Sequence, residues 1–442
     1  MEIFYLIIAV IAIIILTTKL KIHAFLALFI ISILYGIFAG MPYVDIIVSI
    51  NEGFGGTLGK IGLIIVLGVI IGAFLENTGG AFAIAEKVLK IIGSKRVPTA
   101  MGIIGYIVSI PVFADSGFML LHPLNKSLSK KAKISIAGPA IALGLGLMAS
   151  HTMVPPTPGP IAAAGILDAD LGLVIAFGFP TSIVALIVGI IFAKKYASKT
   201  YIEPDVEEVL TTEKEIKDSP GALKSSIPIL VPIVLIVLKS VLNPTKTGLD
   251  NGFIDFINFI GEPVISLLIG IFLCLLLPKK LNYDMLSSSG WVGKAIKDAA
   301  SIILITGAGG IFGKILQNSG IADILGQTLT EYNMGIFLPF VLAAAIKTAQ
   351  GSSTVALVTT ASIIMPMMSS LGFDSEIQKA LVVIVIGAGS AVVSHANDSF
   401  FWVVTQMSGM NVKTGYRLFS LGSGLLGLTG AITVFIFYTI FA

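Results

Sequence analysis

The stretches GVIIGAFLENTGGA (residues 68–81) and GGIFGKILQNSGIA (residues 309–322) have glycines, apolar residues and a polar pair at corresponding positions. The matching positions are Gly68 and Gly309, Gly72 and Gly313, Leu75 and Leu316, Asn77 and Asn318, Thr78 and Ser319, and Gly79 and Gly320. In each half, this motif is followed by an interrupted apolar stretch and then by a span that ends in Ser-His. The Ser-His pairs are Ser150-His151 and Ser394-His395. Three features in one order predict two related halves.

The composition predicts a helical protein that crosses a lipid bilayer several times. The chain has 442 residues, of which 55% are hydrophobic and only 12% are charged, whereas a soluble domain has about 25% charged residues. The net charge of +3 gives no reason to expect a nucleic-acid partner. Cys274 is the single cysteine, so we expect no disulfide framework, no cysteine-based metal site and no cofactor.

The membrane spans follow from apolar runs of about 20 residues. The N-terminus lacks the basic region and cleavage site of a signal peptide, so it reads as a first span. We expect spans at residues 2–18, 23–40, 58–77, 134–152, 171–193, 227–243, 257–278, 299–317, 379–404 and 418–441. Two further apolar stretches, 98–124 and 336–371, are interrupted by proline and polar residues.

Lysine and arginine in short loops predict the orientation, because they gather on the cytoplasmic side. Basic loops at 86–96 and 125–133 flank the stretch 98–124, which is therefore expected to be a re-entrant hairpin that enters from the cytoplasm. The same argument places the second hairpin, 336–371, on the outside. The first copy of the repeat then runs inward and the second outward. Inverted repeats with hairpins are a hallmark of secondary transporters, which bind their substrate near the midplane.

A mixed-charge stretch separates the two halves. We expect a first transmembrane half (1–193), a cytoplasmic linker (194–225) and a second transmembrane half (226–442). The fold class is accordingly an all-α, multi-pass protein of the cytoplasmic (inner) membrane, with a re-entrant hairpin and a broken helix in each half.

The first hairpin carries the polar cluster PVFADSGFMLL (111–121), in which proline and glycine interrupt the helix beside Asp115 and Ser116. Irregular backbone at membrane depth is tolerated where it is buried in protein or lines a water-filled cavity. Both residues are therefore candidates for a binding site. The alternative is an aspartate that only caps a half-helix.

The following span runs into SHTMVPPTPGP (150–160), where four prolines prevent a continuous helix. His151, Thr152 and Thr157 are the polar side chains of this expected break. The alternative is an extracellular loop that begins early.

The second hairpin contains AQGSSTVAL (349–357), with a short donor-rich turn. If a half-helix begins at Thr354, its free N–H groups and positive dipole end favour a carboxylate. The candidate residues are Gly351, Ser352, Ser353 and Thr354. We expect Lys347 to extend its amine toward the outer surface.

The last cluster, SHANDSFFW (394–402), follows an apolar run and has the position of a second broken helix. Ser394 and Asn397 are binding candidates, and His395 and Asp398 are candidates to carry a proton. The alternative is a helix end in the cytoplasmic headgroups.

These clusters, in this order, resemble the gluconate permease (GntP-type) family of proton symporters. The resembling stretches are NEGFGGTLGKIGLIIVLGVIIGAFLENTGGA (51–81), PVFADSGFMLL, HTMVPPTPGP, AQGSSTVAL and SHANDSFFW. The resemblance is collinear over most of the chain. It implies proton-driven uptake of sugar acids or similar small hydroxy or amino acids, an elevator-type motion and, often, a homodimer. The chain departs from the family pattern at Asp115, Thr157 and Phe400, which bears on the substrate more than on the transport class.

The combined expectation is proton-coupled uptake of gluconate or a related small hydroxy acid or sugar acid by alternating access, with a small organic anion and a proton as partners. The substrate-binding candidates are Asp115, Ser116, Thr152, Thr157, Gly351, Ser352, Ser353, Thr354, Ser394 and Asn397. The proton-coupling candidates are Asp115, His151, His395 and Asp398. Two alternatives stay open: a sodium-coupled or exchange carrier for a carboxylate such as glycerate or D-serine, and a channel or intramembrane enzyme. The missing HExxH-type spacing counts against a metalloenzyme, and no metal site is expected.

Overall fold

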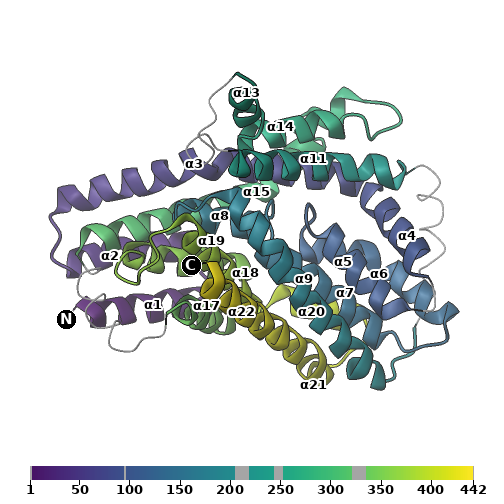
Figure 1. Cartoon of the computed structure of the whole chain (residues 1–442). Helices are drawn as coiled ribbons and strands as arrows, with labels where there is room; N and C mark the ends of the chain where they lie inside the picture. The colour runs from purple at the N-terminus through teal and green to yellow at the C-terminus, as the bar shows by residue number, and fades with distance from the viewer. Residues whose placement is uncertain (1, 94–95, 205–218, 243–251, 321–334, 442) are drawn as a thin grey trace.

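The computed structural model describes residues 2–93, 96–204, 219–242, 252–320 and 335–441, which fold into helices without a β-strand (Figure 1). The α-helices are α1 (Glu2–Thr18), α2 (Ala24–Phe38), α3 (Tyr43–Asn77), α4 (Gly80–Ile92), α5 (Val97–Val108), α6 (Ala114–Lys131), α7 (Ala137–Met153), α8 (Pro158–Ile166), α9 (Leu171–Lys195), α11 (Ala222–Val241), α13 (Gly252–Ile260), α14 (Pro263–Cys274), α15 (Trp291–Asn318), α17 (Phe337–Gln350), α18 (Ser353–Ile364), α19 (Glu376–Ala391), α20 (Ser399–Met407), α21 (Val412–Gly415) and α22 (Leu421–Phe441).

The helices confirm a protein built to cross a membrane. Among the described residues, six helices are long and apolar enough to span a bilayer, or seven if α13 and α14 count together. The expected span 257–278 is not one straight helix, because α13 and α14 meet at an angle of 68°. The expected span 58–77 is only the second half of α3, which has 35 residues. Residues 205–218 of the expected linker lie outside the described residues.

Helices α7 and α19 form the buried centre of the molecule. Every residue of α7 is buried except His151, and α19 is buried without interruption from Ala380 to Ala391. The large exposed apolar side chains lie instead on outer helices such as α1, α2, α11 and α22. This distribution suits a molecule whose outer helices face lipid and whose central helices are shielded from it.

The two expected hairpins are pairs of helices joined by short turns. Helices α5 and α6 are joined through residues 109–113, and α17 and α18 are joined through Gly351 and Ser352. Each pair is followed by a broken helix: α7 breaks before α8 at 154–157, and α19 breaks before α20 at 392–398. The inverted relationship of the halves, and the side from which each hairpin enters, stay predictions.

The broken helices pack on the hairpin of the other half. Helix α8 packs against α18, and α20 packs against α6. The ring of Phe118 on α6 lies 6.2 Å from that of Phe400 on α20, measured between centroids. This exchange brings all four polar clusters to one region.

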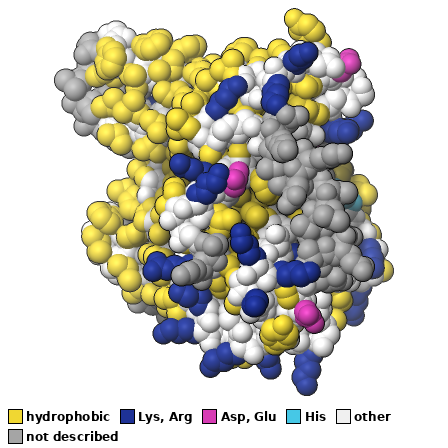
Figure 2. Space-filling view, turned by 90° about the vertical axis from the view of Figure 1, so that its right-hand side faces the viewer, with side chains coloured by type: hydrophobic (Ala, Val, Ile, Leu, Met, Phe, Trp, Pro, Cys, Tyr) yellow, Lys and Arg dark blue, Asp and Glu magenta, His cyan; other side chains and the backbone are white. Residues whose placement is uncertain are grey.

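Lysine and arginine gather on one end of the molecule. Figure 2 views the end at which α4 and α6 lie in Figure 1, and basic side chains far exceed acidic ones on that face. Helix α4 carries Lys90 in its last turn, and α6 ends in Lys130 and Lys131. A basic face of this kind is typical of the cytoplasmic side of a membrane protein.

Candidate functional site

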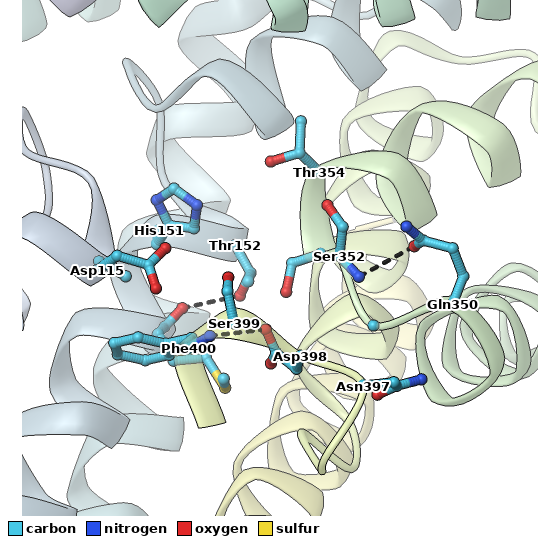
Figure 3. Close-up of a pocket in the computed structure, with 14 residues that line it drawn as sticks. Asp115, His151, Thr152, Gln350, Ser352, Thr354, Asn397, Asp398, Ser399 and Phe400 are labelled. Atoms are coloured by element: carbon cyan, nitrogen blue, oxygen red, sulfur yellow. Dashed lines mark hydrogen bonds between the residues drawn. The ribbon is translucent and has the colours of Figure 1, made fainter. Parts of the chain in front are cut away.

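The four polar clusters meet around one cavity of about 270 Å³ (Figure 3). The lining residues are Ala114, Asp115, Met148, His151, Thr152, Gln350, Gly351, Ser352, Ser353, Thr354, Asn397, Asp398, Ser399 and Phe400. They come from both hairpins and both broken helices. Segments of both halves of the chain therefore build one polar cavity inside an otherwise apolar protein.

Three helices begin at the cavity. Helix α6 begins at Ala114, α18 at Ser353 and α20 at Ser399, so α18 starts one residue before the expected Thr354. The first N–H groups of a helix lack partners within the helix, and the helix dipole places partial positive charge there. Three such ends at one cavity favour an anion.

Side chains at the cavity cap two of these helices. The hydroxyl of Ser352 accepts a hydrogen bond from Val355 N at 3.3 Å, and Asp398 Oδ1 accepts one from Phe400 N at 3.1 Å. The side chain of Gln350 accepts from Ser352 N at 3.0 Å (Figure 3). Since each cap takes only one or two N–H groups, further donors remain near the cavity.

Several hydroxyl groups at the cavity are available to a ligand. Those of Ser353, Thr354 and Ser399 make no hydrogen bond with another described residue. The hydroxyl of Thr152 donates to the Met148 carbonyl at 3.0 Å, which leaves its oxygen free to accept. Hydroxyls act as both donors and acceptors, so this wall suits a hydroxylated molecule.

Asp115 and His151 lie on the opposite side of the cavity from Ser352 and Gln350 (Figure 3). Asp115 Oδ1 and His151 Nδ1 are buried and have no hydrogen-bond partner among the described residues. Unpartnered polar atoms are rare in protein interiors. Both atoms belong to residues that line the cavity, which makes these side chains candidate partners for a ligand.

Asn397 fastens the break between α19 and α20 to the second hairpin. Its amide nitrogen donates to the carbonyls of Thr348 at 2.9 Å and Ala349 at 3.1 Å, and His395 Nε2 donates to Thr348 at 2.6 Å. Gly351 has a φ of +97°, and an added Cβ would lie 2.3 Å from the Asn397 carbonyl oxygen. Only glycine fits this contact.

A buried ion pair joins Asp398, a residue of the cavity wall, to Lys347, which does not line the cavity. Lys347 Nζ is 2.7 Å from Asp398 Oδ2, and the two side chains are 1% and 6% exposed. The ammonium also donates to the Gly351 carbonyl, and the Ser394 hydroxyl donates to the same carboxylate oxygen. The expectation that Lys347 reaches the outer surface is therefore wrong. The sequence signal that could have indicated burial is the position of Lys347, one helical turn before the hairpin tip.

Some predicted residues do not line the cavity. They are Ser116, Thr157, Ser394 and His395. The Thr157 hydroxyl donates to the Val154 carbonyl at 2.6 Å, and Thr157 borders a separate small cavity with Pro111.

Sequence reasoning missed Met148, Gln350 and Ser399, which do line the cavity. Ser399 carried a usable signal, because it follows the helix-capping Asp398.

No group of three His, Cys, Asp or Glu side chains within the described ranges is placed to hold a metal ion.

Comparisons with known proteins match the chain from end to end. The family model for GntP family permeases matches residues 1–440. A gluconate permease of Pseudomonas aeruginosa is 32% identical over 97% of this chain and 95% of its own length. An uncharacterized permease of Haemophilus influenzae is 34% identical over 99% of this chain and 92% of its own.

Two solved transporters share the fold at low identity. MtrF of Neisseria gonorrhoeae has a TM-score of 0.63 at 16% identity, covering 89% of this chain and 84% of its own. The YdaH transporter of Alcanivorax borkumensis has a TM-score of 0.58 at 15% identity, with 88% of each chain covered.

Proposed function

Because the chain belongs to the GntP family of permeases, we propose that it takes up gluconate or a related small hydroxy acid together with protons. The family relatives indicate a multi-pass membrane transporter rather than an enzyme. The substrate, the coupling ion and alternating access are the parts proposed here.

The observation that carries the proposal is the cavity at which α6, α18 and α20 begin. A volume of about 270 Å³ lies just under the range of about 300–1,000 Å³ for drug-sized ligands, so a small molecule suits it. Helix N-termini supply attraction for a carboxylate. Free hydroxyls on the same walls supply partners for the hydroxyl groups of a sugar acid.

In this proposal, the second hairpin binds the carboxylate of the substrate. The N–H groups at Gly351 and the first turn of α18, together with the hydroxyls of Ser353 and Thr354, would hold its two oxygens. Asn397 and Thr152 would contact substrate hydroxyls. Ser399 joins this set because its hydroxyl faces the same cavity.

Three of the four proton candidates border the cavity: Asp115, His151 and Asp398. Each can exchange a proton with water that enters with the substrate. The fourth, His395, is hydrogen-bonded to a backbone carbonyl of the hairpin and would act by holding the hairpin tip.

Transport itself would proceed by alternating access. The two hairpins and the two broken helices would move as one unit past outer helices such as α3 and α15, carrying the cavity from one side of the membrane to the other. The interlocked packing of α8 on α18 and of α20 on α6 supports motion as a unit. A homodimer would anchor the outer helices.

Uptake by purified protein in lipid vesicles tests the proposal. A pH gradient, acid outside, should drive accumulation of labelled gluconate, glycerate or D-serine, and a sodium gradient at equal pH should not. Accumulation driven only by sodium would favour the sodium-coupled carrier. Exchange without accumulation under either gradient would favour an exchanger, and conductance far above carrier rates would favour a channel. Failure of every carboxylate to be transported or to stabilise the protein would refute the substrate class.

A further inference from the structure

The charge of the cavity wall presents a problem for an anionic substrate. The described lining residues include two carboxylates, Asp115 and Asp398, and neither lysine nor arginine. Nearby groups that can titrate are His151, across the cavity, and His395, on the break that carries Asp398. The full positive charge closest to the wall, that of Lys347, is held by Asp398. An entering carboxylate would therefore meet two carboxylates, one of them paired with Lys347, and only the partial positive charges of the helix ends would attract it.

We propose that Lys347 is a switchable counterion: protonation of Asp398 releases its ammonium, whose charge then holds the carboxylate of the substrate. The inference rests on the proposed function, because it explains how the proposed symport would couple the binding of the proton to the binding of the anion. It assigns a role to a residue that does not line the cavity but whose side chain contacts Asp398 of the cavity wall.

The coupling follows from the burial of the pair. If Asp398 is protonated alone, a buried ammonium loses its partner, which is strongly unfavourable. If the anion binds alone, it adds a third negative charge beside a neutralised lysine. When both events occur together, the number of opposite charges around Lys347 stays the same. The protonated protein therefore binds the anion more tightly than the unprotonated protein does. By reciprocal linkage, the anion-bound protein binds the proton more tightly by the same factor.

The geometry allows the exchange without loss of the local fold. Asp398 uses Oδ2 for Lys347 and for the Ser394 hydroxyl, but Oδ1 for capping α20 through Phe400 N. Protonation of Oδ2 leaves that cap in place. The freed ammonium keeps its bond to the Gly351 carbonyl, which places it at the turn before α18. The lysine charge and the α18 N-terminus then act on the same end of the ligand.

The proton balance is simple. Asp398 takes one proton from water on the outer side, forming an O–H bond at Oδ2, while Lys347 stays protonated throughout. On the inner side the anion leaves, Asp398 returns its proton to water, and the ion pair forms again. A monovalent anion would cross with one proton and no net charge through this pair.

The experiment compares gluconate binding and transport in the wild-type protein, Asp398→Asn and Lys347→Gln. In the wild type, gluconate affinity should rise by up to about tenfold per unit fall in pH, because the proposal links the uptake of one proton to the binding of one anion. Asp398→Asn imitates the protonated form and keeps a residue that caps helices well. Its gluconate affinity should lose this pH dependence, and proton-driven accumulation should be lost while gluconate still exchanges for gluconate.

Lys347→Gln should weaken gluconate binding at least about tenfold at every pH, because a charge-assisted contact is lost. Lys347→Arg should recover part of it. If Lys347→Gln folds poorly, the double variant Lys347→Gln with Asp398→Asn removes both charges and should restore the yield without restoring binding. The control is Lys379→Gln, which breaks the exposed pair with Glu376 on α19 (2.9 Å) and should leave affinity and pH dependence unchanged.

The outcomes separate this inference from the proposed function. A wild-type protein that neither binds nor exchanges a carboxylate would refute the proposed function before any variant is compared. Wild-type gluconate transport with unchanged affinity in Lys347→Gln, or with full pH dependence in Asp398→Asn, would overturn the counterion role alone.

Discussion

Gly72 on α3 lies against Pro111 at the turn of the first hairpin, so closely that an added Cβ would stand 2.1 Å from the Pro111 carbonyl oxygen. Gly313 has the matching position in the second copy of the repeat, where a Cβ would stand 3.1 Å from the Ser362 carbonyl oxygen. The repeated glycines thus support the hairpin of their own half. Close backbone contacts of this kind are typical of small residues in membrane helices.

Gly72→Ala should destabilise the protein by about 1–3 kcal/mol, the usual cost of forcing an extra group into a packed core. The thermal unfolding midpoint of the purified protein measures the effect. Gly55→Ala, on the same helix but with nothing within 4 Å of the new methyl group, is the matched control and should be neutral or slightly stabilising. Equal midpoints for the two variants would contradict the close contact.

Gly351→Ala should abolish gluconate binding. The residue has a left-handed φ of +97° and its Cβ would meet the Asn397 carbonyl oxygen, so the hairpin tip must move away from the break. Gly372→Ala shares the positive φ, at +75°, but meets nothing within 4 Å. It should show only the backbone strain of about 1–3 kcal/mol, with gluconate affinity intact. Loss of affinity in both variants would mean that strain, and not the contact, matters.

Ser352→Ala should weaken both the α18 helix and gluconate binding. The variant loses the N-cap to Val355 N, worth about 0.5–2 kcal/mol, at a helix end proposed to hold the carboxylate. Ser375→Ala removes the N-cap of α19, where Ser375 and Gln378 form a capping box, and Ser375 does not line the cavity. We expect similar losses of thermal stability but a fall in gluconate affinity only for Ser352→Ala. An equal fall in gluconate affinity in both variants would mean that the loss comes from lower overall stability and not from the binding site.

Asn397→Ala should loosen the tip of the second hairpin, because it removes the donors to Thr348 and Ala349. Hydrogen exchange followed by mass spectrometry should show faster exchange around residues 348–353, and gluconate affinity should fall. Asn318→Ala removes a side-chain hydrogen bond to Ser49 on α3 and serves as the control. Unchanged exchange at the hairpin in Asn397→Ala would show that other contacts hold it.

The sequence located the helices and the polar clusters well where the signal is local. Apolar runs and helix breakers predicted both helix pairs, and the turn before Thr354 placed the start of α18 within one residue. The capping roles of Ser352 and Asp398 were not predicted, although serine and aspartate are residue types that cap helices. The bend between α13 and α14 falls at Gly261-Glu262-Pro263, where a charge and a proline mark a helix boundary that the expected span 257–278 ran across.

Contacts between residues that are far apart in the chain could not be predicted from the sequence. Lys347 and Asp398 are 51 residues apart in the chain, and a lysine beside an apolar helix is ordinarily expected to reach the surface. Only packing of the α19–α20 break against the second hairpin buries it. Met148 likewise reaches the cavity because α7 passes through the centre of the molecule, which its uniform hydropathy does not reveal.

The burial of α7 offers a way to observe the cavity from outside. Every residue of that helix is enclosed except His151, and the native thiol, Cys274, is buried as well. A cysteine introduced at position 151 would therefore be open to a water-soluble thiol reagent through the cavity. Labelling intact vesicles from one side and then the other would record which way the cavity opens, and gluconate should slow the reaction.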